Sequence, residues 1–134
     1  MNLTNQDIDT VRRFYAAVGA RDLGTAEACF ALDAIWHVPG NSPIAGDHIG
    51  WAAIRDDFLA RLGPLSGYTF RAELLDVAVG QEYIVAVQRA TAAYQGRQLD
   101  VTGCQLMRME HGHIAEVRGH YSDQCALDAF WKTD

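Results

Sequence analysis

The stretch Ile35-Trp36-His37-Val38-Pro39-Gly40 decides how this chain is expected to fold. It is typical of a short strand, and Pro39-Gly40 marks the point where that strand ends. Two short helical patterns precede the stretch, and a long series of strand patterns follows it. That order predicts a small cone in which helices cover one face of a curved sheet. A cone of this kind encloses an apolar pocket, and we expect Trp36 and His37 near its mouth.

Apolar residues at helical spacing predict three helices in the first half of the chain. The first begins near Thr4, whose spacing from Asp7 is typical of a helix start. The second is expected over residues 23–30. The third is expected over residues 50–62, and Gly63-Pro64 is expected to end it.

The second half of the chain changes from the helical period to the two-residue period of strands. After a brief strand at residues 33–38 and a loop at 41–50, the pattern predicts four consecutive strands with glycine-containing turns, at residues 68–79, 82–94, 98–109 and 114–121. A short helix over residues 123–131 ends the chain. These elements predict one α+β domain spanning residues 1–134, with three N-terminal helices packed on a curved, mostly antiparallel sheet.

Charge and composition exclude several classes of function. The 134 residues include 17 acidic and 11 basic side chains, for a net charge of −6. We expect no nucleic-acid partner, because phosphate neutralisation needs clustered Lys and Arg and the chain has no basic cluster. No apolar run is long enough to span a membrane, and residues 1–19 lack the features of a secretory signal. We therefore expect a cytoplasmic protein.

The sequence contains no motif that indicates a cofactor or a metal. Cys29, Cys104 and Cys125 are widely spaced among apolar residues and are expected to be buried free thiols. His111 and His113 flank a turn glycine, so their side chains are expected to diverge into solvent rather than to bind zinc. No glycine-rich phosphate loop occurs. We expect neither a cofactor nor a metal.

The strand pattern over residues 82–94 is apolar or small on both faces. Ile84 and Ala86 alternate there with Val85 and Val87. One face can meet the helices, but the other face also resists solvation. A homodimer packed through the outer sheet face is the simplest explanation.

Several stretches spread over nearly the whole chain resemble one superfamily. They are Phe14-Tyr15-Ala16-Ala17-Val18, Arg21-Asp22-Leu23, Trp36-His37-Val38-Pro39-Gly40, Ser42-Pro43-Ile44-Ala45-Gly46, the helix at 51–58, Gly112-His113-Ile114-Ala115-Glu116-Val117-Arg118, and the tail from Asp123-Gln124 to Ala129-Phe130-Trp131. With them the chain resembles the NTF2-like superfamily, and within it the SnoaL-like polyketide cyclases and ketosteroid-isomerase-like proteins. The resemblance implies an NTF2-like cone with a pocket for a small hydrophobic ligand. It does not name a reaction, because this fold hosts many chemistries and also non-enzymes.

The departures from the ketosteroid isomerases are informative. Those enzymes place a tyrosine on the first helix, a base aspartate just before the turn after the first strand, and an acidic donor in the penultimate strand. The matching positions here are Phe14, Val38 and Gln105. An aspartate-based steroid isomerase is therefore not expected.

Two residues are candidates for acid/base catalysis. In SnoaL-like cyclases an aspartate after the last strand acts as acid/base, and the resemblance implies that role for Asp123 at the rim of the pocket. Alternatively, Asp123 caps the terminal helix, a position that favours Asp. His37 is the second candidate, as a base or as a donor to an oxygen. If the pocket lies on the Trp36 face of the strand, His37 is structural instead.

Two glutamines and several large side chains are candidates for substrate binding. Gln88 and Gln105 are expected at equivalent inward positions of adjacent strands, where buried amides need partners. They either bond each other or hold a ligand oxygen, on which they would stabilise an enolate-like charge. The other candidates also fit an ordinary core: Trp36, Trp51, Phe58, Met107 and Tyr121. Tyr121 suits a polar role best, because a buried hydroxyl needs a partner.

Two functions stay open. The first is a cofactor-independent acid/base enzyme of the isomerase or lyase type, which acts on a small hydrophobic carbonyl compound by isomerisation, intramolecular cyclisation or hydration. The second is a non-catalytic small-molecule-binding or dimerisation domain of the same fold. We favour the first, because of the resemblance and of the polar residues expected at inward strand positions. The loss of the three isomerase-type positions motivates the second.

Overall fold

One curved sheet forms the framework of the molecule. The structure is a computed structural model that describes residues 3–132. The six strands lie in the order β2-β1-β6-β5-β4-β3, and all neighbours are antiparallel except β1 and β6. Their bounds are β1 (Phe30–Val38), β2 (Gly46–Ile49), β3 (Arg71–Val79), β4 (Tyr83–Tyr94), β5 (Arg97–Glu110) and β6 (His113–Tyr121). The expected α+β class with a mostly antiparallel sheet is confirmed.

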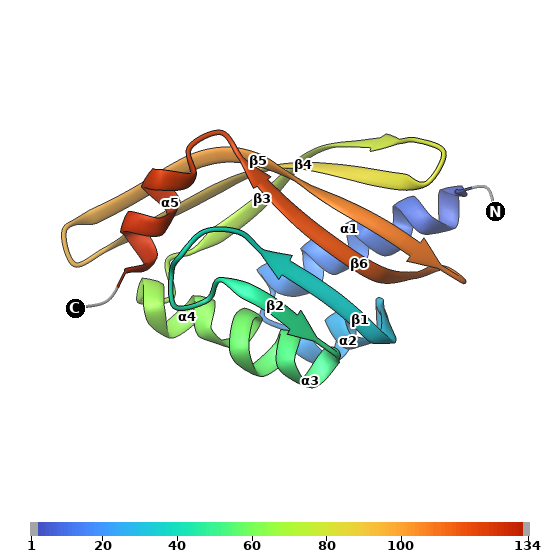
Figure 1. The fold of residues 1–134 in the computed structure, drawn as a ribbon, viewed down its shortest axis with the longest axis horizontal. Helices are drawn as coiled ribbons and strands as arrows, with labels where there is room; N and C mark the ends of the chain where they lie inside the picture. The colour runs from blue at the N-terminus through green and yellow to red at the C-terminus, as the bar shows by residue number, and fades with distance from the viewer. Residues whose placement is uncertain (1–2, 133–134) are drawn as a thin grey trace.

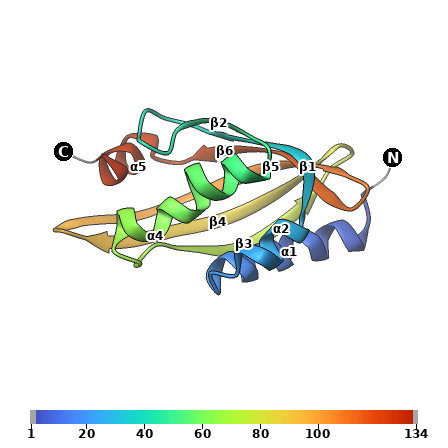
Figure 2. The same cartoon turned by 90° about the horizontal axis from the view of Figure 1, so that it is seen from below.

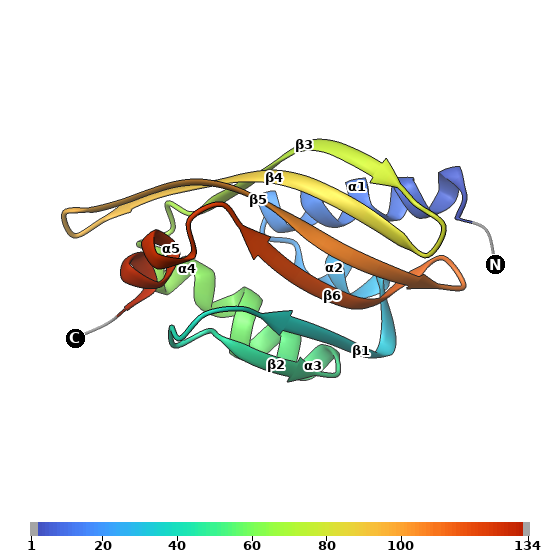
Figure 3. The ribbon, with the colours of Figure 1, turned by 45° about the horizontal axis from the view of Figure 1, so that its top comes forward.

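The helices cover one face of this sheet (Figures 1 and 2). Their bounds are α1 (Asn5–Gly19), α2 (Leu23–Ala28), α3 (Trp51–Ala53), the π-helix η1 (Ile54–Leu59), α4 (Ala60–Ser66) and α5 (Gln124–Trp131). The short α5 lies near the end of the molecule formed by the hairpin of β4 and β5 (Figure 1). The opposite, outer face of the sheet carries no helix among the described residues (Figure 3). None of the helices described is both long and apolar enough to cross a membrane.

Local signals placed several boundaries correctly. The Thr4 hydroxyl accepts from the Asp7 amide at 3.4 Å, and the Asp7 carboxylate accepts from the Thr4 amide at 2.8 Å, which completes the capping box of α1. The turns Gln95-Gly96 and His111-Gly112 have positive φ at both residues, as two-residue hairpin turns require.

The third helix does not end at Gly63-Pro64. It continues through α4 to Ser66, and Gly67 ends it in the left-handed conformation with φ of 61°. Proline removes one amide donor, but its fixed φ is close to the helical value. Burial of Leu62 and Ser66 stabilises the added turn, since neither is more than 7% exposed.

The chain between β1 and α3 is not only a loop. Gly46–Ile49 forms β2, which pairs with β1 so that Ile35 faces Ile49 and Val38 faces Gly46. This strand is four residues long. Its pairing with β1 defines it, because its own sequence shows no strand pattern. Strand β1 also begins earlier than expected, at Phe30, because α2 ends at Ala28.

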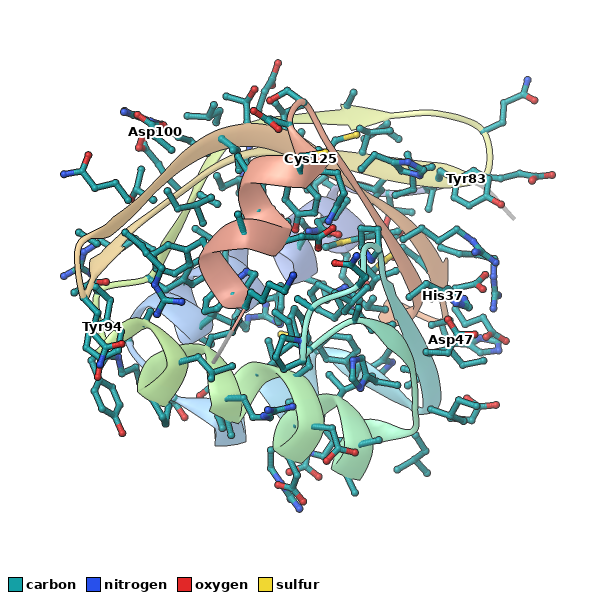
Figure 4. The ribbon with its side chains drawn as sticks, turned by 60° about the vertical axis from the view of Figure 1, so that its left-hand side comes forward. His37, Asp47, Tyr83, Tyr94, Asp100 and Cys125 are labelled. Carbon is teal, nitrogen blue, oxygen red and sulfur yellow. The ribbon has the colours of Figure 1, made fainter. Side chains whose placement is uncertain are left out.

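The three cysteines are free thiols, as expected, but they differ in exposure. Cys29 is buried and Cys104 is half-buried, whereas Cys125 is exposed on α5 (Figure 4). The expectation that Cys125 is buried was wrong. Its helix lies at the periphery, where Leu127, Phe130 and Trp131 supply the buried side.

Candidate functional site

A cavity of about 590 Å³ opens between the C-terminal end of α1, α4 and the edge of the sheet at β3 and β4. Its apolar lining consists of Val18, Leu23, Leu59, Ala60, Leu62, Phe70 and Ala72. The polar residues that line it are Arg21, Tyr68, Arg71, Glu73, Arg89 and Thr91. This volume lies in the range of sites for small molecules.

A second hollow of about 30 Å³ lies beside Tyr121 and Phe58, and Asp128 also lines it. It has room for about one water molecule. Leu62 and Phe70 line both hollows, so these two side chains form the wall between them. The two hollows thus adjoin at Leu62 and Phe70.

Two buried glutamines lie on the inner face of the sheet, each with a tyrosine partner. Gln88 of β4 is 4% exposed, and its Oε1 accepts from the Tyr15 hydroxyl of α1 at 2.6 Å. Gln105 of β5 is 3% exposed, and its Nε2 donates to the Tyr121 hydroxyl at 2.9 Å. The expectation of inward positions is confirmed, but the hydrogen bonds run to tyrosines instead of between the amides.

Besides Gln105, the Gln88 side chain hydrogen-bonds to Tyr121 and lowers its pKa against the larger effect of burial, so both amides lie beside the phenol. Since the Tyr121 oxygen accepts from Gln105, the Tyr121 proton is available to another group. The Gln105 Oε1 is buried and has no partner among the described residues. Burial raises the pKa of both Tyr121 and Tyr15, so each hydroxyl stays protonated and neutral.

Gly103 makes room for the ring of Tyr121. The two residues face each other across β5 and β6, and a Cβ on Gly103 would lie 2.6 Å from the Tyr121 Cδ1 atom. A larger side chain at this position would therefore displace the tyrosine. The glycine is part of the geometry that sets the Tyr121 hydroxyl.

His37 lies on the other face of β1 from the buried Trp36. Its Nδ1 is 2.6 Å from an Asp47 carboxylate oxygen, and its Nε2 is 2.7 Å from a Glu116 oxygen (Figure 4). Each contact is a hydrogen bond when the ring nitrogen that makes it carries a proton. The hydrogen bond from His37 lowers the pKa of Glu116. Both hollows lie on the Trp36 side of β1. In that case the sequence predicts that His37 is structural. A catalytic role for His37 stays a prediction.

Asp123 is the N-cap of α5. Its Oδ1 accepts from the Ala126 amide at 3.0 Å, and the residue is exposed and lines neither hollow. This geometry is that of the capping alternative. An acid/base role for Asp123 stays a prediction, and it would require the carboxylate to leave this amide.

The remaining candidates divide between the core and the small hollow. Trp36, Trp51 and Met107 are buried and line neither hollow. Trp36 packs with its ring centre 4.9 Å from that of Phe58, within a cluster of aromatic rings. Phe58 and Tyr121 do line the small hollow. Their contact with a ligand stays a prediction.

The sequence did not reveal the residues at the mouth of the large cavity. Arg21 and Tyr68 lie in two different turns, and the Arg21 Nη2 donates to the Tyr68 carbonyl oxygen at 2.7 Å. The guanidinium carbon of Arg21 also lies 4.9 Å from the centre of the Tyr68 ring. Neither turn carries a local pattern that predicts this contact.

A curved sheet with helices on one face is the fold of solved NTF2-like proteins, such as one from Burkholderia xenovorans that is 23% identical with a TM-score of 0.77, over 98% of this chain and 100% of that one. The chain belongs to the SnoaL-like domain family, whose family model matches residues 11–117. The matched residues include the inner-face glutamines but end before Tyr121 and Asp123.

Proteins of similar length resemble this chain over nearly its whole extent. Bal32a, from a soil-derived mobile gene cassette, has a solved structure that is 39% identical with a TM-score of 0.91, over 96% of this chain and 98% of that one. A protein of unknown function with a cystatin-like fold from Xanthomonas campestris is 30% identical with a TM-score of 0.88, over 99% and 100% of the two chains. An uncharacterized protein of Mycobacterium tuberculosis is 33% identical over 129 residues, which are 93% of this chain and 95% of the relative.

Proposed function

We propose that this protein is a cofactor-independent acid/base enzyme that acts on a small hydrophobic carbonyl compound by isomerisation, cyclisation or hydration. The observation that carries the proposal is the Tyr121 hydroxyl, a buried neutral donor beside a hollow, with its proton not used by Gln105. A carbonyl oxygen is the ligand group that such a donor binds. The apolar lining of the adjacent cavity suits the hydrocarbon part of the compound.

A hydrogen bond from Tyr121 would polarise the carbonyl group and stabilise the negative charge that develops on its oxygen when an adjacent C–H bond loses its proton. Gln105 is a positioning residue in this scheme, because its Nε2 fixes the phenol oxygen. Asp123 is the proposed acid/base residue at the end of β6, and His37 is the second candidate. Entry from the large cavity requires Phe70 or Leu62 to move, since they form the wall before Tyr121.

A non-catalytic ligand-binding domain is the second candidate. The observation that favours it is the position of the two ionisable candidates, with Asp123 engaged as a helix cap and His37 held by carboxylates on the outer face. The same cavity would then bind a hydrophobic compound without reaction. Both functions bind the same class of ligand, but only the enzyme transfers a proton to or from it.

Proton exchange distinguishes the two functions. Binding of α-tetralone and γ-decalactone is measured by calorimetry, and exchange of the α-protons of α-tetralone in deuterium oxide is followed by proton NMR. For the enzyme we expect accelerated exchange, reduced about a hundredfold in Tyr121→Phe because an oxygen-binding donor is lost. Tyr83→Phe is the matched control, since Tyr83 is 42% exposed at the start of β4 and lines neither hollow.

Each result decides between the candidates. Binding without exchange supports the non-catalytic domain and contradicts the enzyme. Exchange that Tyr121→Phe leaves unchanged contradicts the role of the phenol. If neither compound binds, the proposed ligand class is wrong for both functions.

The homodimer through the outer sheet face also stays a prediction. Leu75 and Val79 are large exposed apolar side chains of β3. A second copy packed on β3 and β4 would cover them. Light scattering on the parent chain and on Val87→Glu measures the mass, and we expect a dimer for the parent and a monomer for the variant. A monomeric parent chain would contradict the dimer.

A further inference from the structure

The mouth of the large cavity is positively charged in a protein whose net charge is −6. Three arginines, Arg21, Arg71 and Arg89, line the cavity together with one carboxylate, Glu73. Most arginines of this chain lie outside the cavity, whereas these three lie together at it. The cavity thus combines an apolar wall with basic side chains at the edge of the sheet, where the exposed Arg71 and Arg89 alternate with inward alanines.

Two of these arginines are not neutralised by a carboxylate. Arg89 forms two hydrogen bonds to Asp100, at 2.8 and 2.6 Å, and faces Glu73 across β3 and β4. Within residues 3–132, neither Arg21 nor Arg71 forms an ion pair. Asp100 balances the charge of Arg89, and Glu73 balances one further positive charge. The net charge at the rim of the cavity is therefore about +1.

The backbone holds Arg21 at the mouth. Arg21 has φ of 58° and Tyr68 has φ of 63°. Both are left-handed backbone conformations that residues other than glycine rarely adopt. At Arg21 this conformation ends α1, where the Asp22 amide donates to the Ala17 carbonyl oxygen at 2.8 Å. The Arg21 guanidinium uses one of its donors on the Tyr68 carbonyl oxygen. Arginine carries five N–H donors, so others stay available to an anion.

We propose that the large cavity binds an amphiphilic monocarboxylate, with the hydrocarbon part against Val18, Leu62 and Phe70 and the carboxylate at Arg21 and Arg71. The guanidinium group suits a carboxylate because its parallel donors match the two oxygens. A single negative charge balances the rim, whereas a dianion would exceed it. This inference rests on the proposed function and deepens it, because it names the charged group that the hydrophobic compound carries.

Decanoate and methyl decanoate test the inference, because they share the hydrocarbon chain and differ in charge. Calorimetry on the full chain measures both affinities, and we expect decanoate to bind about fivefold more tightly at low salt. The variant R21Q/R71Q should bind the two compounds equally. The control R12Q/R13Q makes the same change in net charge at two exposed positions of α1 outside the cavity, and it should keep the preference.

The outcomes separate this inference from the proposed function. Equal binding of the acid and the ester by the parent chain overturns the inference and leaves binding of a hydrophobic carbonyl compound intact. A preference that R12Q/R13Q also abolishes overturns it as well, since net charge alone would then be responsible. If decanoate, methyl decanoate and γ-decalactone all fail to bind, the proposed function fails and the inference fails with it.

Discussion

The two faces of strands β5 and β6 differ in the kind of polar group they carry. The inner face has Gln105 and Tyr121, which are neutral and hydrogen-bonded to each other. The outer face has Arg108 and Arg118, which contact Glu116 at 3.6 and 3.3 Å, and Glu116 in turn holds His37. Neighbouring residues of one strand thus belong to different electrostatic environments.

The difference follows from solvation. On the outer face water reaches the side chains, so charges are tolerated and their pairs contribute little. On the inner face an unpaired charge would cost several kcal/mol, whereas a neutral amide or phenol needs only a hydrogen bond. On the inner face of these two strands the groups that can donate to a ligand are therefore the Tyr121 phenol and the Gln105 amide. His37, in contrast, lies on the outer face, and Asp123 is exposed.

The largest expected effect comes from a charge placed on the inner face. Gln105→Glu should destabilise the fold by about 3 kcal/mol near neutral pH, because the buried carboxylate loses its hydration. Burial raises the pKa of the new carboxyl in the folded chain, so this loss should shrink as the pH falls and the group becomes neutral. Urea unfolding at several pH values measures it.

Gln98→Glu is the matched control on the same strand, since Gln98 is exposed. It should change the unfolding free energy by less than about 0.5 kcal/mol. Equal losses of unfolding free energy at positions 105 and 98 would show that the inner face is hydrated. That result would contradict the difference in solvation between the two faces.

Loss of a hydrogen bond on the inner face should have the next largest effect. Tyr15→Phe removes the donor to Gln88 and leaves a buried oxygen without a partner, at a cost of about 2 kcal/mol. Tyr83→Phe, at an exposed position, should have almost no effect on the unfolding free energy. A cost near zero for Tyr15→Phe would indicate that water replaces the phenol.

The sequence predicted what local periodicity determines. Alternation along β4 and β5 placed Gln88 and Gln105 inward, and the structure confirms both positions. The partners of these residues could not be predicted, because Tyr15 is 73 residues away from Gln88 in the chain. The contact between Arg21 and Tyr68 likewise joins turns that are 47 residues apart.

The same limit explains the missed strand and the position of the cavity. Strand β2 is defined by its pairing with β1, and its four residues carry no pattern strong enough to predict it. Large side chains such as Trp36 and Met107 fit a pocket wall or a core equally well by sequence. Their place depends on how α1, η1 and the sheet fill the interior, and the structure places both in the core.

Asp123 should show a medium effect that separates its two roles. Asp123→Ala should lower the unfolding free energy by about 1 kcal/mol, since the Ala126 amide loses its acceptor, whereas Asp123→Asn should retain most of the stability because Asn also caps helices. Unfolding and α-proton exchange are measured on both variants. Loss of exchange in the stable Asp123→Asn variant would assign acid/base function to Asp123, and retention of exchange would leave it the cap alone.

The smallest effect is expected on the outer face. Glu116→Gln should cost about 0.5 kcal/mol near neutral pH, because its contacts with His37 and Arg118 are partly exposed to solvent. The pKa of Glu116 is lower in the folded chain than its ordinary value of 4.5, so the carboxylate contributes stability above that pH and loses it as the pH falls through the folded pKa. The parent and the variant should therefore converge in acid, and Glu110→Gln, at a more exposed position of β5, should differ less from the parent at every pH. A cost as large as that of Gln105→Glu would mean that the outer face is shielded from water, as packing against a second copy would produce.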